Sequence, residues 1–185
     1  MNNKVQLSAY KTTIAIGANK PTQLFWYFVN VIFFKSSFPF PSSFKTYLLK
    51  LFGAKVGTGV RFKPCINIKF PWKLTIGNDC WIGENVWIDN LESVTIGNDC
   101  CLSQGALLLT GSHDAMRSSF DYTSGSITLE DGVWLGAKCI VTAGVTCGSH
   151  SVLGAGSVGD KNLESNTMYK GNPALPVLKR IINNK

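Results

Sequence analysis

The sequence contains no Asp or Glu before residue 79, although Lys and Arg together occur eleven times in that stretch. Residues 79–185 hold seven bases and eleven acids, so the basic first part accounts for the net charge of +7. No recognised nucleic-acid motif accompanies the basic residues, and we therefore expect no nucleic-acid partner. A membrane surface or a phosphate-rich substrate fits this charge distribution better.

The sequence also lacks a Cys-x-x-Cys pair, and its two His residues do not lie at ligand spacing from any Cys. We therefore expect no metal site. The six cysteines are Cys65, Cys80, Cys100, Cys101, Cys139 and Cys147. We interpret them as buried free thiols in a reducing cytosol, because free Cys packs as a small apolar side chain.

Long apolar runs are missing as well. The densest one, Leu24 to Phe34, has eleven residues and is too short to span a bilayer. Residues 1–23 are polar and have no apolar h-region, so we expect a flexible arm and no signal peptide. The hydrophobic content of 45% and the charged content of 16% over 185 residues are typical of one folded domain with a sizeable core.

Residues 129–158 repeat with a period of six, as LEDGVW, LGAKCI, VTAGVT, CGSHSV and LGAGSV. The first place of each hexad is aliphatic or Cys, and the fifth place is small or β-branched. A helix repeats its apolar face every 3.6 residues and a simple strand every two, so neither explains the pattern. A period of six indicates very short strands, each turning a corner into the next, as in a parallel β-helix.

Hexads begin near Val56, and similar phrases recur at matching points: LTIGND at 74–79, VTIGND at 94–99 and ITLEDG at 127–132. Three hexads and a short corner therefore form one turn, and the turns must stack to bury their apolar faces. We predict an all-β coil over residues 54–164. One excursion, residues 111–126, interrupts it, and a long loop in a compact solenoid is usually functional.

The segments at either end of the coil are predicted to be extensions. Residues 24–53 favour two short helices, separated by Pro39 and Pro41 and ended by Gly53. They can plug the open end of the coil, or residues 24–52 can lie on a membrane surface, and the two interpretations are compatible. If the segment lies on a membrane surface, the residues at headgroup level are Trp26, Tyr27 and Phe33. Residues 165–185 are predicted to form a C-terminal tail or short helix.

Several motifs resemble those of the hexapeptide-repeat acyltransferases, and more narrowly the acetyltransferases of colanic-acid and related polysaccharide biosynthesis. They are LLKLFGAKVGTGVRFKP (48–64), PWKLTIGNDCWIGENVWIDNL (71–91), TGSHD (110–114), GVTCGSHSVLGAGSV (144–158) and YKGNPA (169–174). The resemblance spans about residues 24–180. It implies a left-handed β-helix of triangular section, a homotrimer, and acetyl-CoA bound between neighbouring coils, with no metal required.

The resemblance also implies a catalytic residue, because His113 in the excursion matches the catalytic histidine of the family. A neutral imidazole near pH 7 can remove a proton from an attacking hydroxyl, so His113 would be the general base. Asp114 can orient the imidazole, bind the acceptor or merely form a turn. Asp89 and Asn90 match a corner where relatives contact the acceptor, although turn chemistry explains this pair equally well.

Three further residues would contact the cofactor near its thioester. Ala137 and Ala155 match positions whose backbones contact the pantetheine arm, and small side chains let that thin arm approach the coil. Trp134 follows the family pattern Val-Trp-[Ile/Leu]-Gly and would line the thiol end of the tunnel. Alternatively, Trp134 belongs to a subunit interface.

Basic residues would bind the nucleotide and phosphate end of the cofactor. Lys161 matches a residue near the nucleotide, and Lys179 and Arg180 fall near basic residues that bind the phosphates. The alternative for all three is ordinary solvated charge. The other histidine, His150, occupies a corner position, and we expect it to be exposed and without a role.

Together these features predict a cytoplasmic, acetyl-CoA-dependent O-acetyltransferase that acts on a sugar hydroxyl in surface-polysaccharide biosynthesis. The acceptor would be a sugar or a lipid-linked sugar, with peripheral contact at the inner membrane face. An N-acetyltransferase acting on an amino sugar, or one that inactivates an antibiotic, would share every motif. A non-catalytic β-helix scaffold is the alternative from another class. The related γ-type carbonic anhydrase fold needs three histidines, and this sequence has two.

Overall fold

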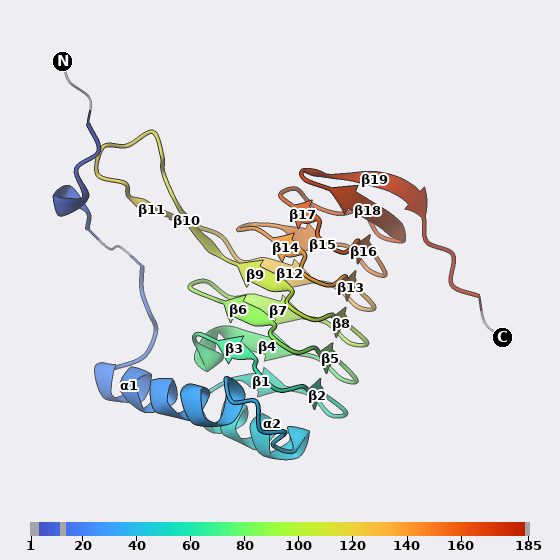
Figure 1. Cartoon of the computed structure of the whole chain (residues 1–185), viewed down its shortest axis with the longest axis horizontal. Helices are drawn as coiled ribbons and strands as arrows, with labels where there is room; N and C mark the ends of the chain where they lie inside the picture. The colour runs from blue at the N-terminus through green and yellow to red at the C-terminus, as the bar shows by residue number, and fades with distance from the viewer. Residues whose placement is uncertain (1–3, 12–13, 184–185) are drawn as a thin grey trace.

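The computed structural model describes residues 4–11 and 14–183 of the chain. Its main body is a coil of short strands, with helices across one end and a hairpin projecting from one flank (Figure 1). The predicted arm (1–23) and C-terminal extension (165–185) therefore lie partly outside the described residues.

The strands of the coil stack into three sheets, which we name A, B and C. Sheet A contains β1 (Lys55–Val56), β4 (Leu74–Ile76), β7 (Val94–Ile96), β12 (Ile127–Leu129) and β15 (Thr146–Cys147). Sheet B contains β2 (Arg61–Phe62), β5 (Trp81–Ile82), β8 (Cys101–Leu102), β13 (Trp134–Leu135), β16 (Val152–Leu153), β18 (Thr167–Gly171) and β19 (Ala174–Lys179). Sheet C contains β3 (Asn67–Ile68), β6 (Trp87–Asp89), β9 (Leu107–Leu109), β14 (Ile140–Val141) and β17 (Val158–Gly159).

Pairing between successive turns is parallel and in register. Arg61 pairs with Trp81, and Trp81 pairs with Cys101, so each of these first turns takes twenty residues. That length is the three hexads plus a two-residue corner that the sequence predicts. The structure therefore confirms the stacked β-coil.

The core lies inside the coil because successive side chains of a strand point to opposite faces. In β1 and β2 the first residue is exposed and the second, Val56 or Phe62, is buried. The fifth places of the hexads, at the corners, are buried as well. In the last coils these are Val133, Cys139, Val145, Ser151 and Ser157. Burial of each aliphatic side chain contributes about 1.5–3 kcal/mol to the stability of the fold. The apolar positions of the hexads are therefore what drives the turns to stack.

A ladder of side-chain amides and carboxylates explains the recurring phrases IGND and LEDG. The side chain of Asn98 accepts a hydrogen bond from Asn78 N at 2.9 Å, and Asp131 accepts one from Asn98 N at 2.7 Å. The adjacent glycines permit this close stacking, because a Cβ on Gly77 would lie 2.7 Å from the carbonyl carbon of Gly97. Each phrase therefore joins one turn to the next.

All six cysteines are free thiols, of which four are buried and two, Cys65 and Cys101, are half-buried. Burial raises the pKa of Cys139 and of Cys147 to about 12 in each case. The prediction of buried thiols therefore holds for four of the six.

These two thiols give the first testable expectation. In the unfolded chain the two thiols have the ordinary thiol pKa of 9.0. In the folded chain the pKa of each is about 12. Their contribution to stability is complete below about pH 9 and is lost as the pH rises toward 12. Iodoacetamide at about pH 8 should modify Cys139 and Cys147 in urea but not in the folded chain, as peptide mass spectrometry can measure. Rapid modification of the folded chain would contradict this burial.

Two helices close the first turn of the coil. Helix α1 (Lys20–Val29) continues into a π-type turn, η2 (Asn30–Phe34), and α2 (Ser42–Leu51) follows. Trp26 is 2% exposed and donates from Nε1 to the carbonyl of Ile68 at 2.9 Å. Gly53, at φ +89°, ends α2 in a conformation that favours glycine. The helices thus cover the terminal apolar layer.

The aromatic residues of this segment divide between two sides. Trp26 and Phe34 pack into the end of the coil, and Phe33 is half-buried against Phe40 and Phe44. The expectation that Trp26 and Phe33 lie at lipid headgroup level is therefore wrong, because the coil needs them as packing. Tyr27 points outward and is 60% exposed.

The C-terminal extension forms two strands, β18 and β19, rather than a helix. Strand β19 pairs antiparallel with β18, for example Met168 with Leu178. In the part of the chain that the structure describes, no helix is both long enough and apolar enough to cross a bilayer.

Candidate active site

The excursion that carries His113 is a β-hairpin. Strands β10 (Gly111–His113) and β11 (Tyr122–Ser124) pair antiparallel, and Gly125 N donates to Thr110 O at 3.0 Å at the base. The hairpin is inserted between β9 of sheet C and β12 of sheet A, at what we call the C–A corner. It projects from the flank of the coil beside the N-terminal segment (Figure 1).

His113 is held in one tautomer by the backbone of the hairpin. Its Nδ1 lies 2.8 Å from the carbonyl oxygen of Phe120. A carbonyl can only accept a hydrogen bond, so Nδ1 carries the proton and the neutral ring keeps its lone pair on Nε2. This is the tautomer in which Nε2 can accept a proton.

Three aromatic rings, from Phe120, Tyr122 and Tyr10, form a cage around the imidazole. The ring of Phe120 stacks on His113 at 4.3 Å between centroids, and the ring of Tyr122 is tilted against it at 4.4 Å. Tyr10 makes a T-shaped contact with His113 at 5.9 Å. Gln6 N donates to Ser118 O at 2.7 Å, which ties the N-terminal arm to the hairpin.

Asp114 does not orient the imidazole, because the Phe120 carbonyl does so and the Asp114 carboxylate is engaged elsewhere. Its Oδ1 accepts from Met116 N at 2.9 Å, and its Oδ2 lies 3.3 Å from Arg117 Nε. Arg117 also pairs with Asp121 at 3.1 Å, which fixes the hairpin tip. A cavity of about 530 Å³ opens between the arm and the hairpin, and Asp114 is among its lining residues.

Asp89 lies on the same corner, one turn below the hairpin. Its Oδ1 is 2.8 Å from Lys69 Nζ, at an angle unsuited to a hydrogen bond, so the contact is an ion pair. Burial raises the pKa of Tyr122, and the nearby Asp89 carboxylate and Tyr10 raise it further, while Lys69 opposes them. Asp89 itself pairs in register with Leu109, two residues before the hairpin strand β10.

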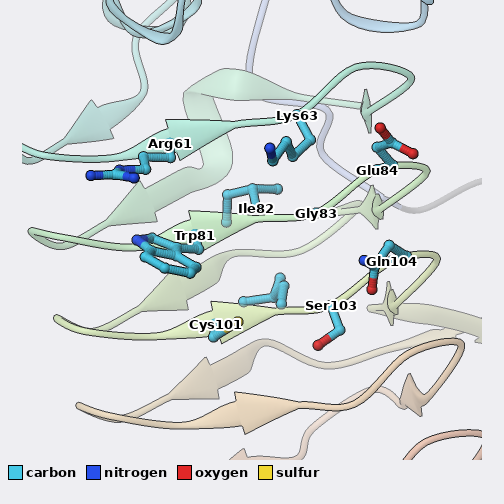
Figure 2. A pocket seen from close by; sticks show the side chains of 10 residues that line it. Arg61, Lys63, Trp81, Ile82, Gly83, Glu84, Cys101, Ser103 and Gln104 are labelled. Atoms are coloured by element: carbon cyan, nitrogen blue, oxygen red, sulfur yellow. The ribbon is translucent and has the colours of Figure 1, made fainter.

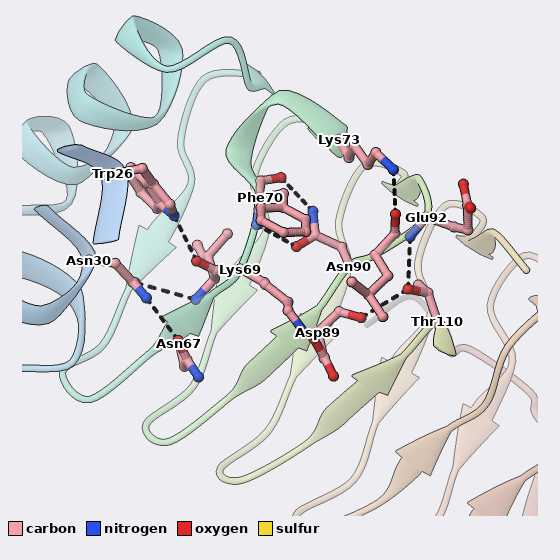
Figure 3. A network of polar contacts seen from close by, with 12 residues as sticks. Trp26, Asn30, Asn67, Lys69, Phe70, Lys73, Asp89, Asn90, Glu92 and Thr110 are labelled. Carbon is pink, nitrogen blue, oxygen red and sulfur yellow. Dashed lines mark hydrogen bonds and ion pairs between the residues drawn. The ribbon is translucent and has the colours of Figure 1, made fainter. Parts of the chain in front are cut away.

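Asn90 has a structural task in the coil. Its Nδ2 donates to the carbonyl of Phe70 at 2.6 Å, and its Oδ1 accepts from Phe70 N at 2.9 Å (Figure 3). Asn90 is fully buried, and Thr110 continues the same polar network through Asp89 O and Glu92 N. The assignment of Asn90 to acceptor binding stays a prediction.

Ala137 and Ala155 lie directly above one another at the corner that joins sheets B and C. Gly156 N donates to Ala137 O at 2.8 Å. A Cβ on Gly136 would lie 2.5 Å from Ala155 N, so these turns have no room for larger groups between them. The small side chains leave the outer backbone open, which suits a thin pantetheine arm.

The basic candidates lie apart from this corner. Lys161 is exposed and follows β17 on the C–A corner, above the hairpin. Lys179 Nζ contacts Glu164 at 3.2 Å and Thr167 at 2.9 Å. Arg180 Nη1 donates to the carbonyls of Gly132 and His150, at 3.0 and 3.1 Å, on the A–B corner.

His150 is not exposed, contrary to the expectation from the sequence. It is half-buried, and its ring packs over Gly132, where a Cβ would lie 2.1 Å from the imidazole. The residue is therefore part of the corner packing rather than exposed.

Trp134 lies on the outer face of sheet B and donates from Nε1 to Ser103 Oγ at 3.0 Å. On the same face, toward the helical end of the coil, is a pocket of about 410 Å³ (Figure 2). Its wall includes Trp81, with the Arg61 guanidinium 5.3 Å above the ring, and the corner residues Glu84 and Gln104. The sequence interpretation did not single out this pocket.

The structure thus gathers His113, Asp114, Asp89 and Asn90 along the C–A corner, and it places Ala137 and Ala155 on the B–C corner. Sequence reasoning missed Lys69 and the three cage residues. Phe120 and Tyr122 were detectable as the aromatic residues of the His-bearing excursion. Tyr10 gave no signal, because its contact with His113 joins distant parts of the chain.

A coil of stacked hexads with three parallel sheets defines the parallel β-helix class of fold, and comparisons with known proteins show which family the chain resembles. The family described as "Hexapeptide repeat of succinyl-transferase" matches residues 73–109 and 126–158, on either side of the hairpin. The chain is 36% identical over 165 residues to "Putative colanic acid biosynthesis acetyltransferase WcaF" of Escherichia coli (strain K12), covering 89% of this chain and 91% of that protein. It is 29% identical to the galactoside O-acetyltransferase of the same strain, covering 76% and 70%.

Among solved structures, the hexapeptide-repeat acetyltransferase VCA0836 of Vibrio cholerae, complexed with acetyl coenzyme A, superposes with a TM-score of 0.77. It shares 21% identity, and the match covers 86% of this chain and 87% of that one. The chain belongs to the hexapeptide-repeat acetyltransferase family, and the predicted enzyme class, an acyltransferase, is confirmed. The coil is the predicted left-handed β-helix, an exception to the right-handed rule for parallel crossovers.

Proposed function

We propose that the chain is an acetyl-CoA-dependent O-acetyltransferase that acts on a sugar hydroxyl in surface-polysaccharide biosynthesis of the colanic-acid type. The observation that carries the proposal is the hydrogen bond from His113 Nδ1 to the Phe120 carbonyl, which leaves Nε2 free as a base. The relatives named for colanic acid biosynthesis and galactoside O-acetylation support a sugar acceptor.

In this proposal His113 moves one proton in each direction. Acetyl-CoA supplies the acetyl group as a thioester. His113 Nε2 removes the proton of the acceptor hydroxyl as its oxygen attacks, and later returns it to the departing thiolate. The imidazolium formed in between is stabilised by the Phe120 carbonyl and by the faces of the aromatic cage.

Acceptor binding is assigned to the polar groups along the C–A corner. Asp89 lies one turn below the base of the hairpin, and Asp114 lines the cavity between arm and hairpin. Carboxylates accept hydrogen bonds from sugar hydroxyls, so both suit a sugar or a lipid-linked sugar. Asn90 supports the same corner through its bonds to Phe70.

The cofactor assignment requires a second copy of the chain. Ala137 and Ala155 fit the pantetheine arm, and Trp134 on sheet B is close to that corner, yet His113 projects from the C–A corner. In a homotrimer the hairpin of one protomer meets the B–C corner of its neighbour, which brings base and thioester together. Lys161, Lys179 and Arg180 are proposed to contact the nucleotide and phosphates from the surrounding corners.

An acceptor screen monitored by release of free CoA tests the function. We expect release that depends on a sugar bearing a free hydroxyl. A strong preference for amino sugars would replace O-transfer by N-transfer. Absence of acceptor-dependent release with every sugar tested, from a trimeric protein, would favour the scaffold.

Tyr10 gives a further prediction about the cage. Replacing Tyr10 by Ala should lower kcat/KM about tenfold, because an aromatic pair contributes about 0.5–1.5 kcal/mol and this one positions His113. Tyr10→Phe keeps the ring and should retain the wild-type rate, whereas Leu7→Ala, an exposed change in the same arm, is the matched control. A Tyr10→Ala variant with full activity across the pH profile would show that the arm does not position the base.

A further inference from the structure

The helical segment at the end of the coil is apolar on two opposite sides. Its inner side, with Trp26, Val29 and Phe34, is buried against the first turn. Plugging a solenoid needs only one apolar stripe, and the opposite side of a surface helix is ordinarily polar. The outer side here is apolar as well, so packing against the coil does not explain it.

Six large apolar side chains of α1 and η2 make up this outer side, which we call the docking face. They are Leu24, Phe25, Tyr27, Phe28, Val31 and Ile32, and each is 40–62% exposed. Phe25 also packs against Phe52, at 5.7 Å between ring centroids, and a large part of each of the six side chains stays uncovered within the described residues. A contiguous apolar face of this kind on a folded protein marks an interaction site.

The charge around the docking face indicates what binds there. Lys20 and Lys35 lie at the two ends of the α1–η2 segment and Lys50 lies on α2, and all three are exposed. None of them forms an ion pair within the described residues. With no acid anywhere in residues 1–78, the face repels another copy of itself and attracts a negatively charged surface.

We propose that the docking face binds an anionic lipid bilayer, with α1 and η2 lying in the plane of the membrane surface. Aromatic and aliphatic side chains enter the interface, the Tyr27 hydroxyl remains at the headgroups, and the lysines contact lipid phosphates. The segment is too short to cross the bilayer, so the contact is peripheral.

Docking at this end of the coil places the hairpin at a defined height. The hairpin follows β9, two strand spacings from β3 on sheet C, which is about 10 Å at the usual spacing. The base of the hairpin that carries His113 would then be held at a fixed distance from the bilayer surface, beyond the helices and the first turns of the coil. If the proposed function holds, its acceptor is a sugar whose lipid carrier is anchored in the same membrane.

Co-flotation of the full-length protein with vesicles tests the docking. Vesicles of phosphatidylcholine with phosphatidylglycerol should bind the protein, and phosphatidylcholine alone should bind it weakly. Replacing Lys20, Lys35 and Lys50 by Gln should weaken partition roughly a hundredfold, at about fivefold for each lysine. Replacing Phe25, Phe28 and Ile32 by Ser should weaken it by at least that factor.

The matched control replaces Leu175, Val177 and Ile181 by Ser, three exposed apolar side chains at the opposite end of the chain. This variant should float as the wild type does. Unchanged flotation of the docking-face variants would overturn the proposal, as would a change in their oligomeric state by light scattering, which would assign the face to a second copy. Transfer to a soluble sugar without vesicles is measured in parallel, so failure of docking and failure of the acetyltransferase assignment give different results.

Discussion

Replacing His113 by Ala is expected to lower the rate of acetyl transfer by about a thousandfold, within the range found for loss of a positioned general base. The physical reason is the fixed tautomer. The Phe120 carbonyl accepts a hydrogen bond from Nδ1–H, which leaves Nε2 as the only basic atom of the ring. The measurement is kcat for CoA release at saturating acceptor, together with the pH profile. Loss of the base should remove the ascending limb of that profile.

His150→Ala is the matched control, since it removes the only other histidine, which packs over Gly132 far along the chain from the hairpin. Its transfer rate should stay within about twofold of the wild type. If the His113→Ala variant keeps its oligomeric state and its full rate of acetyl transfer, the hairpin is not the catalytic element. That result would favour the scaffold interpretation.

Replacing Trp26 by Ala should reduce the free energy of unfolding by about 3–5 kcal/mol, the usual cost of deleting a buried aromatic side chain. Trp26 is 2% exposed, contacts Phe34 and Phe52, and donates a hydrogen bond to the Ile68 carbonyl. For a chain of this length the melting temperature should fall by about 10 °C, as calorimetry or circular dichroism can measure.

Tyr27→Ala provides the control for this experiment, because the neighbouring residue on the same helix points outward. Without lipid its effect on stability should be within about 0.5 kcal/mol. Equal destabilisation by the two changes would mean that the helix does not seal the coil through Trp26.

The coil could be predicted from sequence because its signal is local. The position of a residue within its hexad predicts whether its side chain points inward. The phrases IGND and LEDG mark the corners where the side chains of Asn98 and Asp131 form hydrogen bonds to a neighbouring turn. The same regularity exposed the excursion that carries His113, since an interruption is visible only against a strict repeat.

The site was less predictable because its contacts join distant residues. Tyr10 and His113 lie 103 residues apart in sequence, and nothing in a polar arm indicates that contact. Asn90 matched an acceptor position by sequence, yet its amide is bonded to Phe70, one turn away. The sequence left Trp26 open to lipid contact or to plugging the coil, and the structure uses it to close the coil.

The closed ends of the coil also govern whether the protein forms fibres. A stack of parallel rungs leaves unpaired backbone donors and acceptors on its first and last turns, and such edges recruit further strands. Helices α1 and α2 shield the first rungs, and β19 turns back antiparallel along the last strand of sheet B. Removing either terminus should therefore convert a discrete particle into one that polymerises end to end.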